Sequence, residues 1–351
     1  MRRIITILFF GISIIFADDN VKTHHTADGF KNPFPGFKEN GMADFFKWVI
    51  WDKITGNYPA KPDSYSFKVV PNDGEFLRQN RGQYTVTWVG HSTLLIQIGG
   101  MNILTDPIWS KRSSPVQFAG PARYVEAGIK FENLPPIDLV VISHDHYDHL
   151  DKQTIKKLGN RPHYLVPLRV GKYLEDWGIV KYQEFDWGDS IKVNNVLFIC
   201  APAQHFSGRS PFRRNDTLWS SWIIKSEDYS FYYGGDSGYF PGFLEIGEKY
   251  GPFDIAALPI GAYLPRWFMK PVHLNPEEAV QAYLDLQAQK FIAIHWGTFD
   301  LADEPLDWPP EHLRIAVGKK DLNPDNFLIL NHGQTHILKE NGRIQSRSPK
   351  Y

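Results

Sequence analysis

The sequence predicts an α+β fold in which layered β-sheets form the centre and helices lie outside. Short apolar patterns typical of strands follow one another closely between residues 84 and 104. From residue 137 onwards, strand patterns alternate with helical ones. With 351 residues, 42% of them hydrophobic, the chain can bury one large core or two small ones. Strands first and mixed elements later favour packed sheets that are covered by helices.

The N-terminal end has the composition of an export signal. Met1-Arg2-Arg3 precedes an uncharged apolar run from Ile4 to Ala17, which is shorter than the roughly 20 residues of a spanning helix. We expect residues 1–17 to be a signal peptide and the protein to be periplasmic or otherwise extracytoplasmic; an uncleaved anchor is the alternative. The single cysteine, Cys200, cannot form an internal disulfide.

Residues 18–60 form a polar lead and an aromatic amphipathic helix, ahead of the main domain at 61–340 and a polar tail at 341–351. Asn40 is the expected cap of this helix. Packing onto the main domain is one interpretation of its apolar face, and insertion into a membrane interface is the other. Burial would distinguish them. The face consists of Met42, Phe45, Phe46, Val49 and Ile50, flanked by Trp48 and Trp51.

The first strands of the main domain are expected at 84–89, 93–98 and 101–104. A short turn, Gly90-His91-Ser92, joins the first two. Asp106 follows the third strand directly. A carboxylate at this point either caps the turn or accepts a proton from a metal-ligating imidazole and so fixes its tautomer.

A dense polar cluster follows the apolar run at 137–142 and reads Ser143-His144-Asp145-His146-Tyr147-Asp148-His149. Three imidazoles and several carboxylates within so few residues are costly to bury unless a cation neutralises them. The first two histidines point the same way in an extended loop, whereas Asp148 and His149 come after a turn. This spacing suits two metal ions. A solvated turn is the alternative interpretation for the His-x-His pair taken alone.

The alternation of elements continues after this cluster. A helix is expected at 151–158, and a second begins at Pro276, where acidic residues favour the positive end of the helix dipole. Three later polar residues, His205, Asp236 and His295, stand near strand ends. The remaining strands are expected at 163–166, 190–199, 222–225, 229–233, 255–258 and 291–294.

The pattern His-x-His-x-Asp-His, with the later His, Asp and His in the same order, resembles the metallo-β-lactamase superfamily. Further blocks, among them Leu104-Thr105-Asp106-Pro107 and His273-Leu274-Asn275-Pro276, closely resemble the family of phospholipases D that hydrolyse N-acylphosphatidylethanolamine. The similarity extends from about Phe34 to Gly333. It implies a metallo-β-lactamase-like αββα sandwich of two mixed sheets packed face to face.

The resemblance also implies a ligand set and a cofactor. Imidazole and carboxylate without thiolate suit two zinc ions per chain, with iron and manganese as alternatives. Asp106 would support a ligating imidazole from outside the ligand set. The implied ligands are His144, His146 and His205 for one ion, Asp148, His149 and His295 for the other, and Asp236 as the bridge.

The family activity implied for the chain is hydrolysis of N-acylphosphatidylethanolamine to a fatty acid ethanolamide and phosphatidic acid at a membrane surface. Asp148, Asp236 and His273 would be catalytic. Tyr147 and His273 would contact the substrate, although each could instead have a packing or exposed loop role.

Other functions stay open at the level of sequence. One is hydrolysis of a lactone or small phosphodiester by the same fold, and another is lipid binding without catalysis. The net charge of -1 provides no basic field for a nucleic acid, so we expect no nucleic-acid partner. A homodimer is compatible with the sequence.

Overall fold

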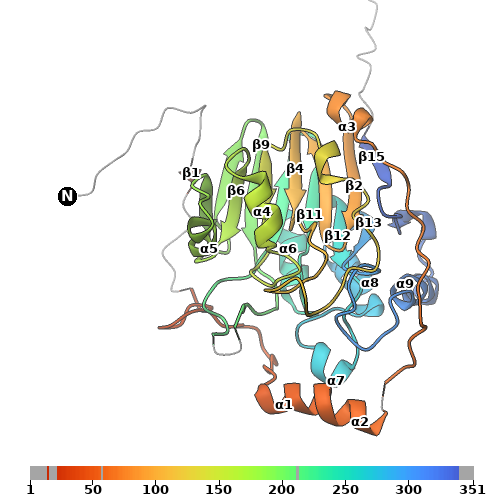
Figure 1. Cartoon of the computed structure of the whole chain (residues 1–351). Coiled ribbons are helices and arrows are strands. Elements are labelled where there is room, and N and C mark those ends of the chain that lie inside the picture. The colour runs from red at the N-terminus through yellow and green to blue at the C-terminus, as the bar shows by residue number, and fades with distance from the viewer. Residues whose placement is uncertain (1–13, 16–21, 57, 211–212, 340–351) are drawn as a thin grey trace, which may run out of the picture.

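Two β-sheets packed face to face form the centre of the protein, and helices cover their outer faces (Figure 1). The computed structural model describes residues 14–15, 22–56, 58–210 and 213–339. Both sheets contain parallel and antiparallel pairs, so the predicted αββα sandwich is confirmed. The predicted signal peptide, residues 1–17, lies almost entirely outside the described residues and stays a prediction.

The first sheet has the strand order β15-β2-β3-β4-β5-β6-β7. Its first three pairings are antiparallel and its last three are parallel. All strands predicted in this part of the chain are present, although the strand within 137–142 is shorter than its apolar run. The strands are β2 Tyr84–Gly90, β3 Thr93–Ile98, β4 Met101–Thr105, β5 Leu139–Val141, β6 His163–Pro167, β7 Tyr182–Phe185 and β15 Thr335–Lys339.

The second sheet has the order β1-β8-β9-β10-β11-β12-β13-β14. The prediction of one strand at 190–199 is wrong, because the chain forms a hairpin there with Asn194 at a φ of 52°. Asparagine tolerates this left-handed conformation and so permits the turn. The strands are β1 Ile14–Ile15, β8 Ser190–Val193, β9 Val196–Ala201, β10 Ser221–Lys225, β11 Ser230–Tyr233, β12 Phe253–Pro259, β13 Ala288–Ile294 and β14 Phe327–Leu328.

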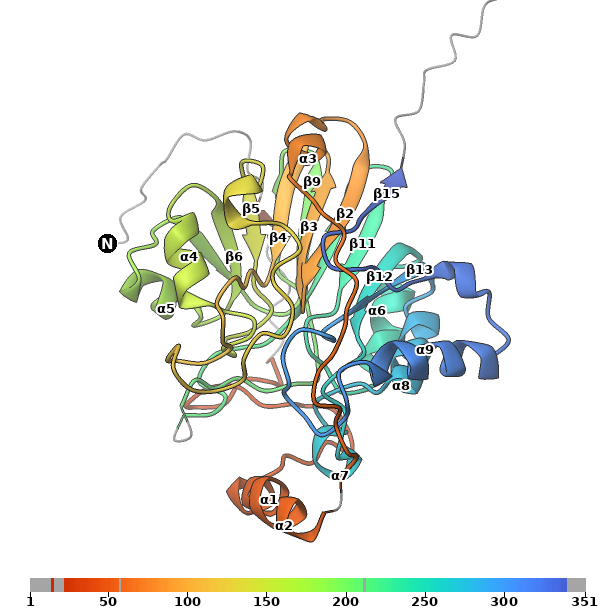
Figure 2. The ribbon, with the colours of Figure 1, turned by 45° about the vertical axis from the view of Figure 1, so that its right-hand side comes forward.

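The main core lies between the two sheets. Trp88 and Trp222 are fully buried there, and the Trp222 indole donates a hydrogen bond of 2.8 Å to the carbonyl of Ile142. This bond ties the second sheet to the start of the polar cluster. Helices pack on the outer faces of both sheets (Figure 2). They are α3 Glu75–Gln79, α4 Lys152–Leu158 and α5 Gly171–Asp176 beside the first sheet, and α6 Gly242–Tyr250, α8 Pro276–Asp285 and α9 Trp308–Lys319 beside the second.

The aromatic helical segment stands away from the sheets, next to α7 (Arg266–Met269), in both views (Figures 1 and 2). It begins after Gly41 rather than at the predicted cap Asn40. Its apolar side chains are largely exposed, so the interpretation that they pack onto the main domain is wrong for most of them. Its parts are α1 Met42–Phe46, a π-helix Lys47–Asp52 and α2 Lys53–Thr55, and its exposed side chains are Met42, Phe45, Phe46, Val49, Ile50, Trp51 and Ile54.

The side of this segment that faces the rest of the protein is attached mainly by polar contacts. Trp48 stacks on Phe268 with ring centroids 5.0 Å apart, and its indole donates to Asp303 at 2.8 Å. Lys53 lies 2.6 Å from the same carboxylate. The segment is therefore held in place with its apolar side turned to solvent. None of the described helices is both long and apolar enough to span a membrane.

A buried carboxylate anchors the chain that leads to this segment. The Nε2 atoms of His24 and His25 each lie 2.7 Å from an oxygen of Asp186, and Lys22 Nζ lies 3.0 Å away. Asp186 follows β7 and is only 5% exposed. The three basic side chains thus fix residues 22–31 to the edge of the first sheet.

We predict that Asp186→Ala lowers the free energy of unfolding by about 3 kcal/mol, because it leaves His24 and Lys22 without their buried partner. Urea denaturation measures this change. Glu132→Ala is the control, since its ion pair with Lys157 is exposed and should leave the unfolding curve unchanged. Equal curves for Asp186→Ala and wild type would show that the cluster does not anchor the N-terminal segment.

Candidate metal centre

The predicted ligands lie at one edge of the sandwich because the strands that precede them end there. The loop 143–150 follows β5, His205 follows β9, Asp236 follows β11 and His295 follows β13 directly. β9, β11 and β13 run in the same direction within the second sheet. Parallel strands place their carboxyl ends together, which is where α/β proteins commonly build sites.

The first group of ligand atoms comes from three histidines. His144 Nε2 lies 2.8 Å from His146 Nδ1, and His205 Nε2 lies 3.2 Å from the same atom. Both His144 and His205 are almost fully buried. The three nitrogens therefore converge on one point, as three imidazole ligands of a single ion would.

The second group combines two carboxylates and two histidines. Asp148 Oδ2 lies 3.3 Å from both His149 Nε2 and His295 Nε2. Asp236 Oδ2 lies 3.1 Å from each of the same two nitrogens. Asp236 Oδ2 is also 3.8 Å from His205 Nε2, so this carboxylate stands between the two groups. The loop turns between His146 and His149 through a backbone hydrogen bond of 3.1 Å, as the spacing predicted.

The geometry of the second group fits a cation. Zinc bound tetrahedrally at about 2.0–2.1 Å from each ligand would separate the ligand atoms by about 3.3 Å. The observed separations of 3.1 and 3.3 Å are close to that value. In addition, His149 Nε2, His295 Nε2 and Asp236 Oδ1 are buried without a hydrogen-bond partner among the described residues. Buried polar atoms that converge without partners are expected where an ion binds.

The charges of the site suit metal binding. Burial lowers the pKa of His146 and of His205 to about 3, so both imidazoles are neutral at pH 7. Burial opposes the proton on His295 as well, but Asp236 and Asp148 outweigh it and raise its pKa to about 9. The same two carboxylates raise the pKa of His149 well above its usual value. Without an ion, protons on these two histidines balance the carboxylates.

Asp106 occupies the supporting position that the sequence suggested. Its Oδ2 lies 2.6 Å from His149 Nδ1 and accepts a hydrogen bond of 2.7 Å from Tyr233. The backbone N–H of Ser143 donates to the other oxygen at 2.7 Å. Asp106 therefore orients His149 so that Nε2 points into the site. His205 is oriented in the same way, with Nδ1 2.8 Å from the carbonyl of Val272.

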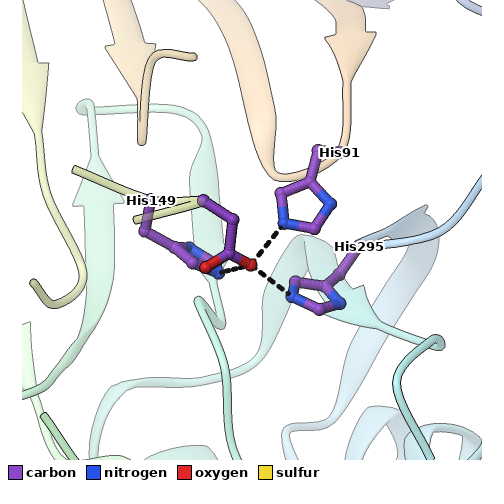
Figure 3. Close-up of side chains that lie close together, drawn as sticks. His91, His149 and His295 are labelled. Carbon is purple, nitrogen blue, oxygen red and sulfur yellow. Dashed lines mark hydrogen bonds and ion pairs between the residues drawn. The ribbon is translucent and has the colours of Figure 1, made fainter. Parts of the chain in front are cut away.

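Sequence reasoning assigned no role to His91, which the structure places in the site. Its Nε2 lies 2.8 Å from Asp148 Oδ2, and Figure 3 shows His91, His149 and His295 around this carboxylate. The signal in the sequence was the turn Gly90-His91-Ser92 between two buried strands. A histidine at such a strand end has the same setting as the predicted ligands.

Tyr147 and His273 both border the site, in different ways. The Tyr147 hydroxyl donates to the carbonyl of Arg209 at 2.8 Å, and the Arg209 guanidinium lies 4.0 Å from the centre of its ring. The hydroxyl is thus engaged and one face of the ring is covered by the guanidinium, while Tyr147 still borders the pocket beside the ligands. His273 Nδ1 lies 3.9 Å from Asp236 Oδ2 and has no hydrogen-bond partner among the described atoms. Burial lowers the pKa of His273 to about 3, so the ring is neutral.

A pocket of about 690 Å³ opens above these groups. His146, Asp148, Asp236, His273 and His295 contribute its polar floor. Its walls are mainly apolar and come from several separate stretches of chain. The apolar lining includes Met42, Phe45 and Trp48 of the aromatic segment, Phe206 after the ligand His205, and Phe268, Met269, Val272 and Leu301.

Comparisons with known proteins agree with this geometry. A family model described as the beta-lactamase superfamily domain matches residues 101–296. An uncharacterized protein of Mycobacterium tuberculosis is 41% identical over 285 residues, which cover 77% of this chain and 75% of the relative. The N-acyl-phosphatidylethanolamine-hydrolyzing phospholipase D 1 of Caenorhabditis elegans is 37% identical over 314 residues, which cover 84% of this chain and 87% of the relative.

Solved structures show the same fold. Igni18, a metallo hydrolase of the archaeon Ignicoccus hospitalis, superimposes with a TM-score of 0.56 at 23% identity. The match covers 72% of this chain and 97% of that structure. The family model spans all seven predicted ligands, and the fold implies divalent metal ions at the His/Asp cluster. The chain therefore belongs to the metallo-β-lactamase superfamily and is a metal-dependent hydrolase.

Proposed function

We propose that the protein is a dinuclear zinc phosphodiesterase of the phospholipase D type, which hydrolyses N-acylphosphatidylethanolamine. The observation that carries the proposal is the pocket of about 690 Å³, whose floor is the His/Asp cluster and whose walls are apolar. A phospholipid has the complementary form, with a charged phosphodiester between long apolar chains. The name of the Caenorhabditis elegans relative supports the same substrate.

In this proposal the two groups of ligand atoms hold one ion each. The first would be held by His144, His146 and His205, the second by Asp148, His149 and His295, and Asp236 would be their shared ligand. The absence of a thiolate among these residues favours zinc, with iron and manganese as alternatives. When bound, the ions supply activation of a water nucleophile and stabilisation of charge on the phosphoryl oxygens.

The residues of the chain provide the rest of the reaction environment. His273 is neutral and its Nδ1 has no partner among the described atoms, so it can donate a hydrogen bond to a phosphate oxygen. The apolar walls bind the acyl chains and exclude bulk water from the phosphodiester. Water adds its oxygen to phosphorus, the bond to the ethanolamine oxygen breaks, and that oxygen leaves as the protonated alcohol of the fatty acid ethanolamide. Phosphatidic acid is the other product.

The exposed aromatic segment supports action at a membrane surface. Trp51 is 62% exposed and Ile54 is 74% exposed, on the segment whose Met42 and Phe45 line the pocket. Phe118, which is 84% exposed, lies in sequence between the pocket-lining residues Pro115 and Pro121. Aromatic and aliphatic side chains around a pocket mouth favour insertion among lipid head groups. Export directed by residues 1–17 would bring this face to an extracytoplasmic lipid surface.

Removing the charge of the proposed ligand Asp148 should abolish most of the activity. Asp148→Asn keeps the shape of the side chain but removes its charge, so ethanolamide release from vesicles containing N-acylphosphatidylethanolamine should fall by at least about 100-fold. Circular dichroism should show an unchanged fold. A near wild-type rate would remove Asp148 from the mechanism, and wild-type turnover of lactones without ethanolamide release would favour the other hydrolase function.

The affinity of the site for zinc should depend on pH. His295, with a pKa of about 9, and His149 must lose their protons to bind an ion, so zinc uptake should release protons. Affinity for zinc, and with it turnover, should therefore fall as the pH is lowered from about 9, by about tenfold per unit for each proton released. Calorimetry in buffers of different ionisation enthalpy measures the protons. Zinc uptake by His295→Gln should release one proton fewer than uptake by the wild type. A zinc affinity that did not change with pH would contradict the assignment of His295 and His149 as ligands.

The exposed apolar side chains of the aromatic segment should contribute to membrane binding. The double variant Trp51→Glu and Ile54→Glu should bind phospholipid vesicles at least about tenfold more weakly, because each side chain loses the free energy of apolar burial. Sedimentation with vesicles measures the binding. Val180→Glu is the matched control, since Val180 is 77% exposed but precedes β7, at the opposite edge of the sheet from the site. Equal weakening by both changes would argue against a docking role for the aromatic segment.

A further inference from the structure

His91 is held rigidly in the turn between β2 and β3. Its φ of 54° is unusual for a residue with a side chain and persists only where surrounding contacts fix it. Its N–H donates to Thr298 Oγ1 at 2.8 Å, and its carbonyl accepts from the Trp88 indole at 2.9 Å. The same carbonyl accepts from the backbone N–H of His295 at 3.0 Å. The turn is therefore tied directly to one of the proposed ligands.

The ring of His91 has one strong polar contact. It is 1% exposed and packs against the His295 ring at 4.1 Å and the Phe299 ring at 5.3 Å. Nε2 lies 2.8 Å from Asp148 Oδ2, while Nδ1 has no partner among the described residues. An ionised carboxylate can only accept a hydrogen bond, so the hydrogen of a neutral His91 ring belongs on Nε2. His91 then donates to Asp148 and to no other group.

To keep its orientation, the carboxylate of Asp148 would need a hydrogen bond from a residue outside the ligand set. Its Oδ2 also faces His149 Nε2 and His295 Nε2 at 3.3 Å, but these nitrogens would be turned to the ion once it binds. The imidazoles of the site have their own supports, with Asp106 behind His149 and the Val272 carbonyl behind His205. His91 Nε2 contacts this same oxygen of Asp148 at 2.8 Å, and its hydrogen bond would remain when the two other imidazoles turn to the ion.

We propose that His91 is a positioning residue that holds the carboxylate of Asp148 in the orientation needed for the second ion. The inference rests on the proposed metal site. Hydrogen-bond partners of ligands typically change metal affinity by about 10–100-fold when removed. Loss of the His91 donor should thus weaken the ion at Asp148, His149 and His295, and leave the ion at the three other histidines unchanged.

The test is a titration of metal-free protein with Co²⁺, followed by visible absorption and by chelator competition. His91→Phe removes the donor but keeps a ring against Phe299, and one of the two Co²⁺ sites should lose about 10–100-fold in affinity while the other is unchanged. His91→Gln restores an N–H donor of similar reach and should recover most of that loss. His332→Phe is the matched control, because His332 is also buried and contacts Thr298, which bonds to His91. It should bind both ions as the wild type does.

Two results would overturn the proposal while leaving the metal site intact. One is binding of two Co²⁺ ions by His91→Phe with wild-type affinity and spectrum. The other is a folded His91→Gln protein whose affinity is as low as that of His91→Phe, since the donor would then not be what matters. If the wild-type chain itself bound no Co²⁺, the proposed metal function would fail first, and the role of His91 with it.

Discussion

The structure depends on the balance of charge in one buried cluster. Asp236 and four of the five proposed histidine ligands are buried, His146 and Asp148 are partly buried, and several polar atoms of the cluster have no hydrogen-bond partner among the described residues. Burying such groups is costly unless protons or cations neutralise the carboxylates. Around the second group, two histidines with raised pKa values provide that compensation in the absence of an ion. An ion would replace the two protons, which links occupancy of the site to pH.

The sandwich provides this cluster with a rigid frame. Each ligand follows a strand, and the strands are fixed by sheet hydrogen bonds and by the core between the sheets. The ligands lie on loops, and a mobile loop would position a metal ligand poorly. Here hydrogen-bond partners of the ligand side chains restrain the loops. Asp106 links the loop after β4 to His149, to Ser143 and to Tyr233 of the second sheet. The site therefore joins the two sheets as well as lying at their edge.

The apolar side of the pocket has a different origin. It is built from a segment outside the sandwich, attached through Trp48, Lys53 and Asp303, and from residues near α7. The rigid frame and the polar floor belong to a widely shared fold, so they indicate hydrolysis but not the substrate. The apolar segment is the part that supports a lipid substrate.

Much of the fold could be predicted from the sequence because its signals are local. Alternating and continuous apolar runs placed β2, β3 and β4, and Pro276 with the acidic residues Glu277 and Glu278 marked the start of α8. The hairpin at 190–199 was missed because its turn is only two residues long, Asn194-Asn195, between two short apolar stretches. Four of the seven predicted ligands were likewise visible as one dense loop, whereas His205, Asp236 and His295 were added by the family resemblance.

Only the tertiary structure decided how distant residues meet. The sequence by itself determined the layered α+β class, the dense polar loop and the positions of the later His and Asp residues, because periodicity and residue type are local properties. It left the aromatic helix open between packing onto the main domain and insertion into a membrane interface. The structure leaves most of its apolar side chains exposed, because burial depends on what the fold brings beside them. The contact of His91 with Asp148 spans 57 residues of sequence and exists only because the turn after β2 and the loop after β5 end at the same edge.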